Sequence, residues 1–198
     1  MTEMLYYEDA YQTRFTAEVT AAVPEEGALV LDRTAFFPGG GGQLPDTGRL
    51  NWTVGGERRT ATVSGMKRAD GGILHIIGAG EGRTEEQQPE LPEAGTEVEG
   101  EIDWDRRYKI MRTHSAMHVL SGVAWRDYGA QVTGGNMDVL SARMDFEFEN
   151  FSADLTHEIE QSVNEEITRG REIKAYILPR TEAEQIPDLI RTKVNLLP

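Results

Sequence analysis

The spacing of hydrophobic residues changes once along this chain, near residues 103–106. Before that point, short runs alternate between apolar and polar residues, at 14–20, 28–32, 48–54, 59–64, 73–77 and 97–102. Gly, Pro, Asn and Asp separate these runs, and many short strands with turn signals are typical of a small barrel or sandwich. After that point the pattern alternates between helix and strand. We therefore predict an α+β protein with a small β-barrel domain at 1–103, followed by an α+β domain at 104–198.

The second half begins with a predicted helix over 106–127, in which Met111, His114, Met117 and His118 share one face. The elements expected after it are a Gly-rich turn at 129–135, a strand at 139–149, a helix at 153–169, a strand at 171–178 and a short helix from Thr181. In the strand at 139–149, alternation places one set of side chains on a buried face: Leu140, Ala142, Met144, Phe146 and Phe148.

Signals at helix ends support two of these elements. Ser152 is the expected N-cap of the helix at 153–169 and Gly170 its stop. Thr181 and Glu184 have the spacing of a capping box. The stretch at 78–96 carries few large apolar residues and is expected to be a loop.

Composition excludes several kinds of protein. The chain has no cysteine, so disulfides are excluded and a cytoplasmic location is the default expectation. No apolar run approaches the length of a membrane span. The net charge of −14 argues against a general DNA-binding or nucleic-acid-binding protein and favours a monomer that does not self-associate.

Two histidines, His114 and His118, lie four residues apart in RTHSAMHVL at 112–120. This spacing puts both imidazoles on one face of a helix, within reach of one metal ion, and zinc is the usual occupant. The pair lacks the intervening Glu of the zinc-protease helix, so that mechanism is not indicated. The spacing alone also fits two histidines packed in a core.

Four consecutive glycines, Gly39, Gly40, Gly41 and Gly42, follow Pro38 in TAFFPGGGGQLPDTG at 34–48. Such a run permits positive φ and close approach of a ligand, and Gln43 adds an amide beside it. No Gly-Lys-Ser/Thr follows, so the run is not a phosphate-binding P-loop. A flexible hairpin loop is the alternative, although the flanking Phe-Phe-Pro indicates an anchored one.

Basic residues cluster at the start of the predicted helix, at Arg106, Arg107, Lys109 and Arg112. A local basic patch on an acidic protein can bind a polyanion, with specificity from shape. The same four residues also fit the solvated face of a helix.

Taken together, RTHSAMHVL, FFPGGGGQLPDTG and ARMDFEF at 142–148 resemble the alanyl-tRNA editing proteins. These are freestanding relatives of the editing domain of alanyl-tRNA synthetase, and the resemblance spans most of the chain. It implies that 104–198 is an editing domain and that the protein is a deacylase that removes serine, and also glycine, from the acceptor end of mischarged alanine tRNA.

The resemblance also implies roles for individual residues. It makes His114 and His118 ligands of one Zn²⁺ per chain, and places Thr133, in AQVTGG, in the amino-acid pocket, with Gln131 as a weaker candidate. The glycine run, Gln43 and the basic cluster become candidates for contacts with tRNA. The family's later Cys and His ligands are absent, and His75 and His157 do not match their positions. We therefore expect that the chain lacks the C-terminal part of the family and is inactive unless other groups complete the site.

Two alternatives remain open. The chain could be a non-catalytic module that binds RNA or a synthetase, with the histidines in its core. It could also be a metallohydrolase that acts on another ester.

Overall fold

The computed structural model describes residues 2–70, 72–78, 90–150, 152–174, 176–186 and 189. The chain forms two compact units, Met1–Ile110 and Met111–Pro198. The division falls inside a long helix, α1 (Trp104–Tyr128). The domain boundary predicted at residue 103, just before this helix, stays a prediction.

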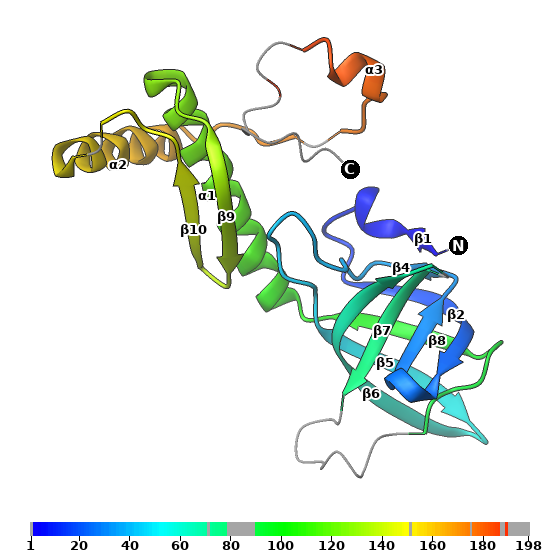
Figure 1. Ribbon diagram of the computed structural model, residues 1–198. Coiled ribbons are helices and arrows are strands. Elements are labelled where there is room, and N and C mark those ends of the chain that lie inside the picture. The colour runs from blue at the N-terminus through cyan, green and yellow to red at the C-terminus, as the bar shows by residue number, and fades with distance from the viewer. Residues whose placement is uncertain are drawn as a thin grey trace. The chain divides into compact units, whose positions relative to one another are not determined.

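The first unit is a closed antiparallel barrel, as predicted (Figure 1). Its strands follow one another around the barrel in the order β2-β3-β7-β6-β5-β8. Their bounds are β2 Arg14–Val23, β3 Ala28–Leu31, β5 Gly48–Val54, β6 Glu57–Ala69, β7 Gly72–Gly78 and β8 Glu97–Ile102. The alternating runs therefore found every barrel strand, although β6 extends beyond the predicted 59–64.

Short elements outside the barrel were not predicted. They are the parallel pair β1 (Glu3–Met4) and β4 (Arg33–Thr34), and the 3-10 helices η1 (Leu5–Tyr7) and η2 (Pro24–Glu26). The predicted loop at 78–96 lies mostly outside the described residues; its first residue, Gly78, ends strand β7, and its other described part, 90–96, contains no strand.

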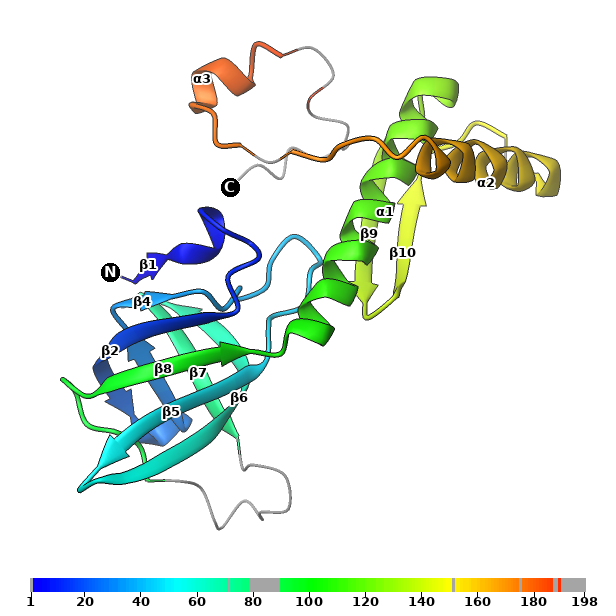
Figure 2. The ribbon, with the colours of Figure 1, turned by 180° about the vertical axis from the view of Figure 1, so that it is seen from behind.

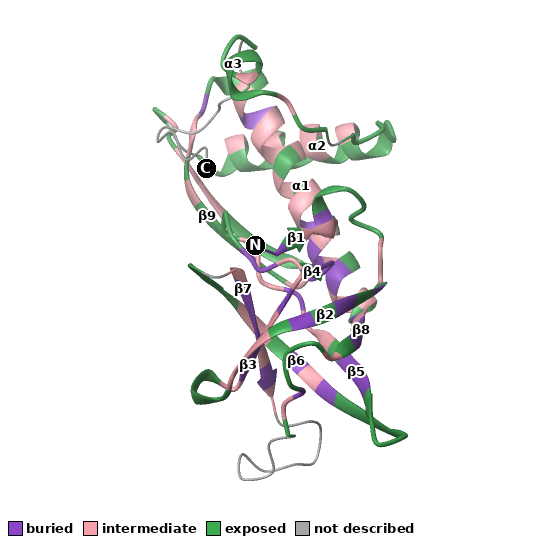
Figure 3. Cartoon of the chain, turned by 90° about the vertical axis from the view of Figure 1, so that its right-hand side faces the viewer, coloured by how far each residue is buried: buried purple, intermediate pink, exposed green. Residues whose placement is uncertain are grey.

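The barrel encloses the main hydrophobic core. Alternate residues of its strands point inward, and in β2 the side chains of Phe15, Ala17 and Val19 are buried while their neighbours are exposed. The core also contains Leu29, Leu31, Phe36, Leu50, Trp52, Val63, Ile77, Val98 and Ile102. Each large side chain buried there contributes roughly 1.5–3 kcal/mol. Figure 3 shows this burial concentrated on the barrel strands.

The second unit contains most of α1, the antiparallel hairpin β9 (Val132–Asp138) and β10 (Ser141–Phe146), and the helices α2 (Ala153–Thr168) and α3 (Arg180–Ala183). Figures 1 and 2 both show the hairpin lying alongside α1. The predicted cap of α2 is confirmed, because Ser152 Oγ accepts a hydrogen bond from the Leu155 N–H at 3.1 Å. None of the helices in the described parts of the chain combines the length and the apolar composition that crossing a membrane requires.

The turn predicted at 129–135 is wrong in its second half. Strand β9 begins at Val132, and Gly134 and Gly135 pair with Asp145 and Met144. A Cβ on Gly135 would lie 2.9 Å from the carbonyl oxygen of Arg143 and 3.5 Å from Cε of Met117 on α1. These glycines therefore allow close packing inside a strand and do not form a turn.

The buried face predicted for 139–149 is also partly wrong. Leu140 lies in the two-residue turn between β9 and β10, with φ +57° and 55% exposure. Ala142 is exposed as well, and Met144, Phe146 and Phe148 are half-buried. Near the turn, the buried residue belongs to the other strand: Met137 of β9 pairs with Ala142 and is only 6% exposed.

The predicted strand at 171–178 is absent from its described residues, 171–174 and 176–178. Ile173, Tyr176 and Ile177 are 69%, 74% and 81% exposed. The two-stranded sheet β10-β9 does not include this segment. The alternating sequence therefore has no neighbouring strand to pair with in that sheet. The predicted short helix exists as α3, but its N-cap is Pro179 without a side-chain hydrogen bond, so Thr181 is not the cap.

Candidate functional site

The imidazoles of His114 and His118 converge on helix α1. Their Nε2 atoms lie 3.1 Å apart, and the rings stack with centroids 4.8 Å apart and an angle of 18° between planes. Two zinc–nitrogen bonds of tetrahedral geometry would separate such atoms by about 3.3 Å. The pair therefore fits two ligands of one zinc ion.

Burial differs between the two rings. His114 is half-buried and His118 is exposed. Burial, together with the neighbouring His118, lowers the pKa of His114, which favours its neutral form. Because metals bind the neutral imidazole, this environment suits a ligand.

A third protein ligand is not found in the part of the chain that the structure describes, where no cluster of three His, Cys, Asp or Glu side chains could hold a metal. His157 is on α2, where its Nε2 lies 2.9 Å from Nε2 of Gln161. His75 is fully buried in the barrel. Neither joins the pair on α1.

Thr133 and Gln131 lie at the start of β9. The pairing of β9 with β10 shifts between Val132 and Gly134, so Thr133 occupies an irregular position in the ladder and is exposed. Gln131 is half-buried, and its carbonyl accepts a hydrogen bond from the Glu147 N–H at 3.0 Å. Since Gly135 of this strand packs near Met117, the strand lies beside the helix that carries the histidines.

The glycine run forms a tight hairpin. Gly40 and Gln43 exchange both backbone hydrogen bonds, at 3.1 and 3.0 Å. Gly41 and Gly42 at the tip have φ values of +59° and +84°, the positive values that a type I′ turn needs at both central positions. Gly41 and Gly42 are exposed, so the backbone at the tip is accessible to a ligand on this side, whereas the Gly40 N–H is used within the hairpin.

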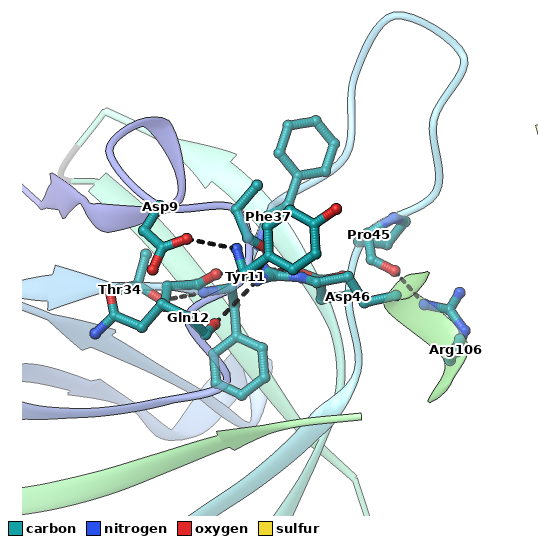
Figure 4. A network of polar contacts seen from close by, with 12 residues as sticks. Asp9, Tyr11, Gln12, Thr34, Phe37, Pro45, Asp46 and Arg106 are labelled. Atoms are coloured by element: carbon teal, nitrogen blue, oxygen red, sulfur yellow. Dashed lines mark hydrogen bonds and ion pairs between the residues drawn. The ribbon is translucent and has the colours of Figure 1, made fainter. Parts of the chain in front are cut away.

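This hairpin is anchored at its base, as the flanking aromatic residues indicated. Phe37 N–H donates to Asp46 Oδ2 at 2.7 Å, and Asp46 N–H donates to the Phe37 carbonyl at 2.9 Å. Arg106 Nη1 donates to the Pro45 carbonyl at 2.6 Å (Figure 4). The loop is therefore tied to the first turn of α1.

The four basic residues do not form one surface patch. Arg107 is only 5% exposed, and its guanidinium donates to the carboxylate of Asp46 and to the carbonyls of Ala35, Ala10 and Gln12. Its predicted role as a phosphate contact is therefore corrected to that of a buried anchor.

The other three basic residues differ in exposure. Arg106 is half-buried on Pro45, Lys109 Nζ lies 2.5 Å from Asp105, and Arg112 is exposed. The sequence of the basic cluster alone does not distinguish the buried arginine from the exposed residues. Asp46, in the glycine-rich segment, was the sequence feature that could have indicated a buried partner for Arg107.

Comparison with known proteins assigns the chain to a family. Residues 2–106 match the model of the class II (A) tRNA synthetases. Over 192 residues the chain is 40% identical to the alanyl-tRNA editing protein AlaX-M of Saccharolobus solfataricus, covering 96% of this chain and 75% of that protein. This chain belongs to the alanyl-tRNA editing proteins.

Other relatives agree with this assignment. The AlaX-M protein of Methanosarcina mazei is 40% identical over 185 residues, covering 93% of this chain and 71% of that protein. The alanine–tRNA ligase of Pyrococcus furiosus is 37% identical over 187 residues, covering 93% of this chain but 19% of the ligase. The similarity thus extends across both units.

Proposed function

We propose that this protein is an editing hydrolase that removes serine, and also glycine, from mischarged alanine tRNA. The observation that carries the proposal is the convergence of His114 and His118 at 3.1 Å, in a chain that belongs to the alanyl-tRNA editing proteins. In the reaction, water adds to the ester carbonyl and the bond to the ribose oxygen breaks. The ribose hydroxyl regains a proton, and the amino acid leaves as a carboxylate.

In this proposal, His114 and His118 hold one zinc ion. Bound there, zinc would polarise the ester or orient it, as Lewis-acidic metal sites do. Among the described residues no third His, Cys, Asp or Glu joins the pair, so water or substrate would complete the coordination. Ester hydrolysis needs little more than positioning and electrostatic stabilisation, so a strong general base is not required.

Selection of serine is assigned to the start of β9. The exposed hydroxyl of Thr133 would hydrogen-bond the serine hydroxyl, which alanine lacks. Gln131 lies beside it, and the exposed backbone of Gly41 and Gly42 at the tip of the glycine hairpin is a candidate for contacts with the tRNA. Thr133→Val should reduce the preference for serine over alanine by about 10-fold, the size expected for one hydrogen bond. Thr156→Val, which changes a threonine on α2, is the matched control.

The decisive assay uses alanine tRNA charged with serine, glycine or alanine. We expect zinc-dependent release of serine and glycine, loss of that release with a chelator, and no acceleration of alanine release. If serine is not released with zinc present while the chain still binds the RNA, the chain is a binding module. Equal hydrolysis of a simple ester such as p-nitrophenyl acetate would instead indicate a general esterase.

A further inference from the structure

Three aromatic side chains form a continuous surface cluster in the first unit: Tyr11, Trp104 and Tyr108. The rings of Trp104 and Tyr108 stack, with centroids 5.4 Å apart and 29° between planes. Tyr11 also contacts Trp104, with centroids 5.5 Å apart and 48° between planes. Tyr11 is 63% and Tyr108 44% exposed, so both tyrosines of the cluster are accessible to solvent.

Hydrogen bonds from a buried arginine hold the backbone on both sides of Tyr11. Nη1 of the buried Arg107 donates to the carbonyls on both sides of Tyr11, those of Ala10 and Gln12, at 3.2 Å each. The N–H of Tyr11 donates to Asp9 Oδ1 at 2.8 Å (Figure 4). An exposed aromatic ring on a backbone held this firmly is ordered before any ligand arrives, which lowers the entropic cost of binding.

The charge around the cluster indicates which part of an RNA it would meet. Lys109 pairs with Asp105, Arg14 pairs with Glu101 at 2.8 Å, and Arg106 donates to the carbonyl of Pro45, so these three cations already have partners within the protein. With a net charge of −14, the chain offers few phosphate contacts. Flat aromatic faces instead suit unpaired bases, because any base can stack on an aromatic ring, whatever the RNA sequence.

We infer that Tyr11, Trp104 and Tyr108 form a platform that stacks on unpaired bases at the 3′ end of an RNA. The inference rests on the proposed function, because the tRNA end that carries the amino acid is single-stranded. Trp104 and Tyr108 belong to α1, the helix that also carries His114 and His118. The platform recognises the end of the substrate, while the histidines serve the hydrolysis.

The test measures binding of an uncharged RNA hairpin with an unpaired 3′ ACCA end, compared with the same hairpin made blunt. Tyr11→Ala and Tyr108→Ala should each weaken binding of the overhanging hairpin by about 10-fold, the size expected for one lost stacking contact. Tyr11→Phe and Tyr108→Phe should bind as the wild type does. Tyr176→Ala, which removes a tyrosine that is 74% exposed in the second unit, is the control.

Because the hairpin carries no ester, this test is independent of hydrolysis. The platform is wrong if the double variant Tyr11→Ala/Tyr108→Ala binds the overhang as tightly as the wild type. The inference is also wrong if the wild type binds the blunt and the overhanging hairpin equally tightly, or if it binds neither hairpin. If the chain binds the overhang through these residues but releases no serine, the proposed function is refuted and this inference stands.

Discussion

Asp46 and Arg107 are buried partners from distant parts of the sequence. Arg107 Nε donates to Asp46 Oδ2 at 3.0 Å, and the two side chains are 5% and 3% exposed. The same arginine reaches the carbonyls of Ala10, Gln12 and Ala35. One side chain at the start of α1 thus holds the N-terminal segment and the base of the glycine hairpin.

Breaking this pair should destabilise the protein strongly. Asp46→Asn and Arg107→Met each leave a charge or a set of polar groups without a partner in the interior, which costs about 3–5 kcal/mol. Urea unfolding measures the loss. Arg14→Met, which removes the exposed pair with Glu101, is the control and should change the free energy of unfolding far less, because exposed ion pairs contribute little. A loss for Asp46→Asn no larger than that of the control would contradict the anchoring role.

Gly48 of strand β5 is a position where a side chain cannot fit. A Cβ there would lie 2.2 Å from the carbonyl oxygen of Glu101 and 2.7 Å from Cε1 of Phe36. Gly48→Ala should therefore cost about 2 kcal/mol or more, or prevent folding. At Gly65 of strand β6, a Cβ meets no atom within 4 Å, so Gly65→Ala should change stability by less than about 1 kcal/mol. Equal thermal unfolding of the two variants would show that the barrel is looser there than described.

His75 should make stability depend on pH. Its Nδ1 lies 3.2 Å from the carbonyl of Leu29, which can only accept, so Nδ1 carries the hydrogen and Nε2 accepts from Thr34 Oγ1 at 2.8 Å. Burial lowers the pKa of His75 to about 4. In the unfolded chain its pKa is about 6.5.

The direction of the pH dependence of stability follows from this difference in pKa. Above the unfolded pKa both states hold neutral His75, and stability is unaffected by this group. As pH falls towards the folded pKa the unfolded state gains the proton first, so up to about 3 kcal/mol is lost. Unfolding free energies measured between pH 7 and pH 4 for the wild type and His75→Gln should differ in slope. His157→Gln, at an exposed histidine, should keep the wild-type slope; parallel curves for all three proteins would exclude His75.

Zinc binding should depend on both histidines of α1. His114→Ala and His118→Ala should each weaken zinc binding by about 100-fold or more, because each removes a direct ligand. Titration with a competing zinc chelator measures the affinity, and His157→Ala is the control. Wild-type affinity in His118→Ala would mean that the two imidazoles do not share an ion.

The barrel was predictable because each of its strands buries one face, and alternation records that burial directly in the sequence. The segment at 171–178 alternates equally well, but a strand also needs a partner edge, which periodicity cannot supply. The close packing of Gly135 against Met117 could not be predicted either, because glycine is typical both of turns and of close packing inside a strand.

Within the site, the histidine pair followed from helical spacing alone, because residues four apart share a face. Arg107 did not, since a buried arginine and an exposed one look the same in a basic cluster. The aromatic platform was missed as well. It joins Tyr11 to residues more than ninety positions later, and such contacts depend on how the barrel closes.

The most direct test of the account links the histidine pair to editing. Rates of serine release from seryl-tRNA for alanine would be measured for the wild type, His118→Asn and His157→Asn at saturating zinc. The account predicts that His118→Asn loses about 100-fold or more of the rate. His157→Asn should match the wild type. Equal rates for all three proteins would contradict the assignment of His114 and His118 as the centre of the reaction.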